Sequence, residues 1–352
     1  MTLADACLAL IVVGMTAYLV LGGADFGAGF WDLTAGSAAR GHRLRALAQR
    51  SMGPVWEANH VWLIFVLVVA WTAFPVAFGS VMSTLYVPLF LAAAGIILRG
   101  LGYALREEAT SVGQARVLGA AFALASVLTP FCLGAAVGAI GSGRVPAGDA
   151  AGAPLGSWLN PASIALGVLA VIAGACLAAV YMAADAARDG LDDLQQAMRR
   201  RALGAGVAAG AVALGSLLVL RSDAPRLYDG LTSGRALVCV LGSTLAGATT
   251  LGLVWRACYG AARFVAAAAV AAITVGWALA QYPDLLPGRL TVGRAAAPHA
   301  TLVALLWAAA VGIVLIAPAL VALYRLAARG EIDEPLEEID RRFAPPGGRA
   351  GP

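Results

Sequence analysis

At residues 53–64 the chain reads GPVWEANHVWLI, and this stretch leads directly into a long apolar run. A proline is tolerated in the first turn of a helix, so we expect a membrane-spanning helix over about 55–71. Its first turns carry Glu57, Asn59 and His60. Ionisable and polar side chains are costly inside a membrane, and their presence there indicates function. The start of this helix is therefore the candidate site.

The rest of the chain is also strongly apolar. Of its 352 residues, 61% are hydrophobic and 12% are charged, and the mean hydropathy is +0.82. Soluble domains carry about 25% charged residues, which excludes that class here. The apolar runs have the length that a helix needs to cross a hydrocarbon core of about 30 Å. We expect an all-α polytopic membrane protein with about nine transmembrane helices.

Hydropathy and polar breaks place these helices along the chain. We expect spans at about 6–21, 55–71, 79–98, 117–140, 164–182, 202–220, 236–255, 264–281 and 301–323. The segment 34–52 is predicted to be a basic loop, and 141–161 and 282–298 to be ordered loops on the other side. Residues 1–329 then form one transmembrane domain, and 330–352 form a flexible cytoplasmic tail that is acidic and then rich in proline and glycine.

The arginines predict the orientation of the bundle. Every basic residue is Arg, and eighteen of the 24 fall in the odd-numbered breaks and the tail, against six on the opposite side. Because cytoplasmic loops retain positive charge, the N-terminus is expected outside and the C-terminus in the cytoplasm. Asp25 and Glu57 then both lie toward the cytoplasmic side. The net charge of only +4 gives no reason to expect a nucleic-acid partner.

The polar start of the second span has two interpretations. In the first, Glu57, Asn59 and His60 form a proton relay, because residues three apart share a helix face. In the second, Glu57 and Asn59 merely cap the helix start, while Trp56 and Trp62 belong to the interfacial aromatic belt. Both interpretations stay open.

Asp25 is the second candidate acid. It lies in the glycine-rich end of the first span, residues 22–32, where small residues let a neighbouring helix approach closely. It is either a second proton site or the partner of Arg99, which projects from the cytoplasmic end of the third span. A buried acid with neither role would be expensive.

Histidines and cysteines argue against a haem or metal bound by this chain. His60 is the one histidine within a predicted span, which cannot supply two histidine ligands to a haem, and no HExxH pattern surrounds it. We expect a hydrogen-bonded structural histidine. The five cysteines are scattered singly, so neither a disulfide framework nor a zinc site is predicted.

The chain resembles subunit II of the cytochrome bd family of quinol oxidases. The segment 23–29, GADFGAG, is similar to the family's G-F-D-x-G-x-G, and 53–64 is similar to its G-P-x-W-D-G-N-x-x-W-L-I. The segments WTAFP (71–75) and LYVP (85–88), with Arg99 and Arg106, also fit. Two positions depart from the pattern, since Gly22 stands where many members have an acid and Ala58 replaces the glycine of D-G-N.

The resemblance implies a haem-free subunit of two helix bundles and a peripheral helix in a bacterial cytoplasmic membrane. The partner subunit I would carry haems b and d, or b only, together with the quinol site and the oxygen-reducing centre. Glu57 matches the acid proposed for a proton path, and Trp56 and Asn59 match its neighbours. A structural quinone is expected near Trp56, Arg99 and Arg106, and some members have a small single-helix accessory subunit.

Three hypotheses follow. The leading one is the oxidase subunit, which stabilises subunit I and lines a cytoplasmic proton path through Glu57 and Asp25. A secondary transporter is the alternative, but it would be expected to show interrupted helices in both halves, whereas the polar residues here gather in the first third. The third is a purely structural membrane subunit whose acids do no chemistry.

Overall fold

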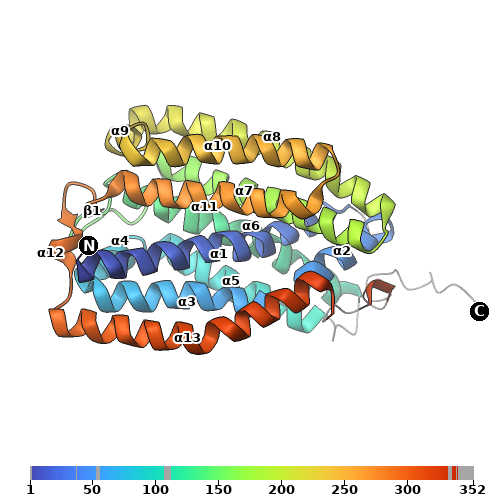
Figure 1. Cartoon of the computed structure of the whole chain (residues 1–352), viewed down its shortest axis with the longest axis horizontal. Coiled ribbons are helices and arrows are strands. Elements are labelled where there is room, and N and C mark those ends of the chain that lie inside the picture. Colours follow the sequence, from blue (N-terminus) through green and yellow to red (C-terminus); the bar gives the residue numbers. More distant parts are fainter. Residues whose placement is uncertain are drawn as a thin grey trace, which may run out of the picture.

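The computed structural model, which describes residues 2–36, 38–52, 56–106, 112–331, 335–337 and 339, is a bundle of long helices along a common axis (Figure 1). The all-α expectation is confirmed. Helix α1 (Leu3–Leu33) lies at the centre, and Thr2 and Asp5 form a capping box at its start. Around it pack α3 (Trp56–Ala73), α6 (Val112–Gly141), α7 (Pro161–Arg188) and α11 (Tyr259–Gln281).

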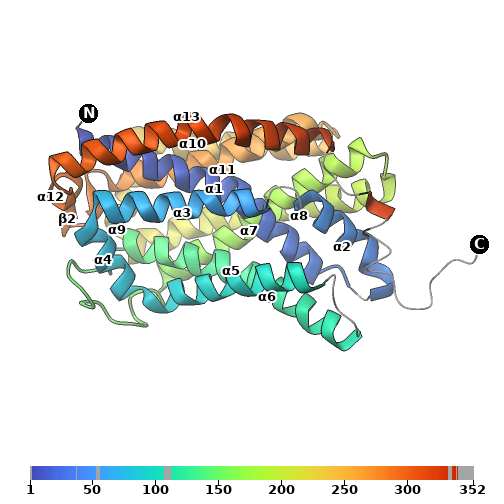
Figure 2. The ribbon, with the colours of Figure 1, turned by 90° about the horizontal axis from the view of Figure 1, so that it is seen from below.

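The outer helices complete the bundle. They are α5 (Tyr86–Arg106) on α6, α8 (Asp192–Asp223) on α7, α10 (Gly234–Trp255) on α11, and α13 (His299–Arg329) along α3 at one edge (Figures 1 and 2). Their outward side chains are large and apolar, for example Leu218, Leu245 and Val314, which are 70%, 70% and 72% exposed. Apolar exposure of this extent is typical of helices that face lipid.

The helix count depends on α3. In the described part of the chain, eight helices are long and apolar enough to cross a membrane, and α3 contributes only the shorter apolar helix Ala58–Ala73. At 1.5 Å per residue its 18 residues reach about 27 Å, close to the thickness of a hydrocarbon core. Helix α3 lies beside α1 and α13. The predicted count of nine membrane-spanning helices is reached only when α3 is included.

The prediction of a loop over 34–52 is wrong, because most of this segment is the helix α2 (Ala38–Met52). Alanine, leucine, arginine and glutamine are strong helix formers, and Leu44 and Leu47 are buried. Three of its arginines make ion pairs with acids of other segments: Arg43 with Asp193, Arg45 with Asp32 and Arg50 with Asp189. The arginines that indicated a loop thus form ion pairs that hold α2 against the end of the bundle.

The third predicted span is two helices rather than one. The chain forms α4 (Pro75–Thr84), breaks at Leu85, and continues as α5 from Tyr86. Pro88 has no backbone N–H, so the helical hydrogen bond that it would donate four residues back cannot form. The break follows from that missing donor, and the membrane-spanning helix begins later than predicted.

Short elements close the bundle end that holds the start of α1 (Figure 1). They are α4, α9 (Pro225–Leu231), the antiparallel strands β1 (Asp284–Leu286) and β2 (Leu290–Thr291), and α12 (Val292–Ala295). The N–H of Ala297 donates to the carbonyl of Ala73 at 2.8 Å, which fastens this loop to the end of α3. Of the predicted tail, only residues 330, 331, 335–337 and 339 are described.

The glycines of α1 confirm the predicted close helix approach. A Cβ placed on Gly27 would lie 1.9 Å from the carbonyl oxygen of Gly174 in α7, so the two backbones touch. Small residues permit this contact between membrane helices, where dispersion replaces the hydrophobic effect as the packing force. The contact fixes α1 against α7 at the depth where Asp25 is buried.

Candidate functional site

A buried arginine organises the candidate site. Arg99 of α5 is 2% exposed, and its guanidinium carbon lies 4.9 Å and 4.7 Å from the ring centroids of Phe26 and Phe122. It donates to the main-chain oxygen of Asp25 at 2.7 Å and to the hydroxyl of Ser126 in α6. Cation–π contacts of this kind strengthen when water is excluded. We call Arg99, Phe26, Phe122 and Ser126 the arginine cage.

Asp25 itself belongs to a second set of contacts. Its side chain is buried at 3% exposure, and its Oδ2 accepts a hydrogen bond from Nδ2 of Asn59 in α3. The Oδ1 of Asn59 accepts in turn from the hydroxyl of Tyr324 in α13, at 2.8 Å. We call Tyr324, Asn59 and Asp25 the carboxylate chain. It joins three helices that are far apart in the sequence.

His60 lies next to these residues in a shell of aromatic rings. Its Nδ1 is 2.8 Å from the carbonyl oxygen of Trp56, one turn back in α3, and its buried Nε2 has no hydrogen-bond partner among the described residues. The rings of Tyr18, Phe26 and Trp56 each meet it edge-on, with centroids 6.1 Å away. Within the described ranges, no three or more His, Cys, Asp or Glu side chains gather as a metal site.

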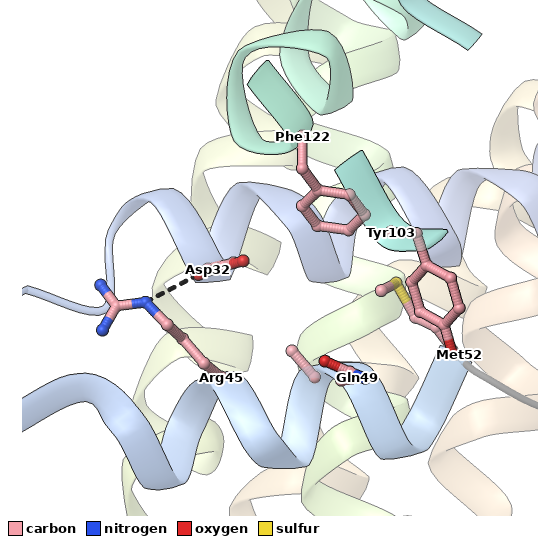
Figure 3. Close-up of a pocket in the computed structure, with 7 residues that line it drawn as sticks. Asp32, Arg45, Gln49, Met52, Tyr103 and Phe122 are labelled. Carbon is pink, nitrogen blue, oxygen red and sulfur yellow. Dashed lines mark hydrogen bonds and ion pairs between the residues drawn. The ribbon is translucent and has the colours of Figure 1, made fainter. Parts of the chain in front are cut away.

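A small cavity lies between α2 and Phe122 of the arginine cage (Figure 3). Its volume is about 10 Å³, near the minimum for one water molecule. Asp32, Arg45 and Gln49 line its polar side, with Nε of Arg45 donating to Oδ1 of Asp32 at 2.8 Å. Met52 and Phe122 line the side toward Arg99, and the sulfur of Met52 is 3.2 Å from the Nη2 of Arg99.

The structure brings together Asp25, Asn59, His60 and Arg99 among the predicted site residues. Arg99 meets Asp25 through its main-chain oxygen, so the choice between proton site and ion-pair partner stays a prediction. The ring of Trp56 packs on Tyr103 of α5, with centroids 5.2 Å apart.

Two predicted residues lie partly outside this description. Glu57 is in the first turn of α3 and Arg106 ends α5, but neither side chain is among the described parts of the structure. Residues 53–55, which begin the stretch GPVWEANHVWLI, also lie outside the described residues. The roles proposed for Glu57 and Arg106 therefore stay predictions.

Sequence reasoning missed several members of the site. Ser126, Phe122 and Met52 carry no motif, because a lone serine, phenylalanine or methionine in or beside an apolar run is ordinary. Tyr324 is the more instructive omission. A tyrosine near the end of a span is normally assigned to the interfacial belt, and only the packing of α13 on α3 shows that its hydroxyl reaches Asn59.

The fold and the site define a multi-pass helical membrane protein with a buried acid and a buried arginine in its interior. Residues 3–327 match the family described as cytochrome bd terminal oxidase subunit II. The chain belongs to this family, whose members lie in bacterial cytoplasmic membranes.

Individual relatives are more distant. Subunit 2 of a cytochrome bd ubiquinol oxidase from Bacillus subtilis is 27% identical over 135 residues, which is 38% of this chain and 38% of the relative. A solved structure of the bd oxidase from Geobacillus thermodenitrificans matches with a TM-score of 0.77 and 24% identity, covering 93% of this chain and 98% of that one. At this identity the structural match shows a shared fold.

Proposed function

We propose that this chain is the haem-free subunit II of a bd-type terminal oxidase, which couples quinol oxidation to reduction of dioxygen to water. Its roles are to stabilise a haem-bearing subunit I and to line a cytoplasmic proton path. The observation that carries the proton path is the burial of Asp25 in a bundle of membrane helices. An ionisable side chain at that place marks a function by default, because burying it is expensive.

The path starts at the α2 end, which the arginine distribution places in the cytoplasm. The pair of Asp32 and Arg45 forms the polar wall of the cavity, and one water there would approach Met52 and Phe122. These two side chains also touch Arg99, which contacts Asp25. The volume of about 10 Å³ is near the minimum for one water molecule, so at most one water would take part in the path at this point.

His60 supports the haem-free assignment. Three aromatic rings with centroids 6.1 Å away surround its imidazole and occupy space that a porphyrin would need. The residues around His60 thus do not fit a haem. The haems of subunit I would supply the oxygen chemistry.

The structural quinone near Trp56, Arg99 and Arg106 is also a proposal. Small-molecule pockets have volumes of about 300 Å³ or more, whereas the cavity beside Tyr103 has about 10 Å³. A quinone in this neighbourhood would therefore lie on the outer surface of the helices rather than in that cavity. A small single-helix accessory subunit remains part of the proposed complex.

Oxygen consumption by the assembled complex tests the proton path. Replacing Asp25→Asn or Glu57→Gln should slow quinol-driven turnover by a factor on the order of 10² to 10⁴, the usual contribution of a positioned proton-transfer group. The haem spectrum should stay unchanged. Glu331→Gln is the matched control, because Glu331 is an exposed residue at the same end of the bundle. Normal turnover in both site variants would remove the path and leave the subunit assignment standing.

Gentle solubilisation tests the assignment itself. Affinity purification of this chain should bring down a coloured, haem-bearing partner in a fixed ratio. A colourless chain that purifies alone and binds a solute would instead favour the transporter hypothesis.

A further inference from the structure

Tyr324, the member of the carboxylate chain that lies farthest from the carboxyl group, has no role in the proposed path. Tyr324 lies in α13, which the described contacts place along α3 and α1 at the edge of the bundle. Its hydroxyl donates to Oδ1 of Asn59 at 2.8 Å, and Nδ2 of the same amide donates to Asp25. The two bonds use opposite ends of one amide group.

Hydrogen-bond capacities make this arrangement directional. An ionised carboxylate only accepts, an amide has one accepting and one donating end, and a phenol hydroxyl both donates and accepts. With the hydroxyl donating to Oδ1 of Asn59, the amide must present Nδ2 to Asp25. Rotating the amide by half a turn would point Oδ1 at the carboxyl group, and only a protonated Asp25 could then donate to it.

We propose that Tyr324 is a positioning residue that holds Asn59 in the orientation for ionised Asp25, and that the amide turns over when Asp25 takes up a proton. In the turned state the carboxylic O–H of Asp25 donates to Oδ1, and Nδ2 donates to the oxygen of Tyr324. The hydroxyl proton of Tyr324 is then free to point away from Asn59. The O–H of Asp25 is the one covalent bond that forms, and its proton arrives from the proposed path.

The surroundings permit such an exchange at Tyr324. The indole nitrogen of Trp62, one turn after Asn59 in α3, lies beside the hydroxyl of Tyr324 and has no hydrogen bond of normal geometry. Tyr324 is half-buried, whereas Asn59 is 1% exposed. Because an indole N–H only donates, the phenol oxygen of Tyr324 can accept from Trp62 or from Nδ2 of Asn59, and this change leaves the buried end of the carboxylate chain closed.

The charged and titratable groups that interact electrostatically with Asp25 come from several helices. Arg99 in α5 acts on the carboxyl group, and Asp25 in turn acts on the hydroxyls of Tyr18 in α1, Tyr181 in α7 and Tyr324 in α13. Of these, Tyr324 alone is hydrogen-bonded to Asn59 among the described contacts. Removing its hydroxyl therefore releases the amide without removing a charge.

The role of this amide rotation rests on the proposed function. Infrared spectroscopy tests the rotation itself. Acid-minus-alkaline infrared difference spectra of the purified complex should contain a carboxyl band that Asp25→Asn removes. Tyr324→Phe should shift that band and slow turnover about fivefold, as expected for the loss of one hydrogen bond. Tyr228→Phe, a half-buried tyrosine in α9 at the other end of the bundle, should do neither.

The outcomes separate the two proposals. An unshifted Asp25 band in Tyr324→Phe overturns the positioning role, even if turnover falls. Unchanged turnover in Asp25→Asn overturns the proton path, and the band in Tyr324→Phe still decides the positioning role. If Tyr324→Phe fails to assemble, Asn59→Ser interrupts the same chain from α3 and must shift the same band for the inference to survive.

Discussion

Gly29 makes room for the arginine cage, and this can be tested by filling that room. A Cβ on Gly29 would lie 2.0 Å from the hydroxyl oxygen of Ser126, 2.4 Å from its Cβ and 2.9 Å from Nη1 of Arg99. Carbon atoms in contact normally stay about 3.5 Å apart. Rotating the Ser126 hydroxyl does not help, because the Cβ of that residue clashes as well. In Gly29→Ala, α1 and α6 must therefore separate by more than about 1 Å.

The free energy of this change follows from three contributions. Overpacking costs about 1 to 3 kcal/mol, and losing the hydrogen bond from Arg99 to Ser126 costs about 1.5 to 3 kcal/mol because the donor is charged. The higher helix propensity of alanine returns about 1 kcal/mol. We expect Gly29→Ala to destabilise the folded chain by about 3 kcal/mol.

Thermal unfolding of the detergent-solubilised protein, followed by tryptophan fluorescence, measures the effect. Gly23→Ala is the matched control on the same helix, because its Cβ would meet no atom closer than 3.8 Å, and its unfolding midpoint should be unchanged or raised. Adding Ser126→Gly to Gly29→Ala should raise the midpoint, although Ser126→Gly alone lowers it. The steric reasoning is refuted if Gly29→Ala is as stable as Gly23→Ala, or if the second substitution lowers the midpoint further.

Two further substitutions test other contacts. Gly27→Ala should prevent recovery of folded protein from membranes, measured by size-exclusion chromatography, because the clash is with the backbone of Gly174 and no side-chain change relieves it; a normal elution profile would contradict this. Arg144→Leu should lower stability by about 1 kcal/mol in the same unfolding assay, since Arg144 donates two bonds to Asp223, at 3.1 Å and 2.6 Å, from a partly exposed position. An equal loss in an Asp223→Asn background would show that the pair is not the cause.

The helices were largely predictable from the sequence, because the length and polarity of a membrane span are set by the bilayer rather than by partner helices. The predicted 236–255 and the observed α10 (Gly234–Trp255) agree within two residues at the start. The errors occur where a local signal was ambiguous. The run of arginines in α2 led to the prediction of a loop, because the acids that pair with two of them, Asp189 and Asp193, lie more than a hundred residues away.

For the candidate site, the sequence predicted several of the residues but not their contacts. Asp25, Asn59, His60 and Arg99 were found because a polar group in an apolar run is visible in the sequence. What each group contacts was not visible. The sequence left open whether Arg99 pairs with Asp25. In the structure Arg99 bonds to the main-chain oxygen of Asp25, and its guanidinium lies over the rings of Phe26 and Phe122.

The carboxylate chain also has a consequence for biosynthesis. Tyr324 follows Asn59 by 265 residues, so at 5 to 20 residues per second its hydroxyl leaves the ribosome on the order of 10 to 50 s after Asn59. During that interval α1 and α3 are already in the membrane, and Asp25 has its amide partner only. A nascent chain that stops before α13 keeps the early pair but never acquires the phenol. Helix α13 thus completes a site that α1 began.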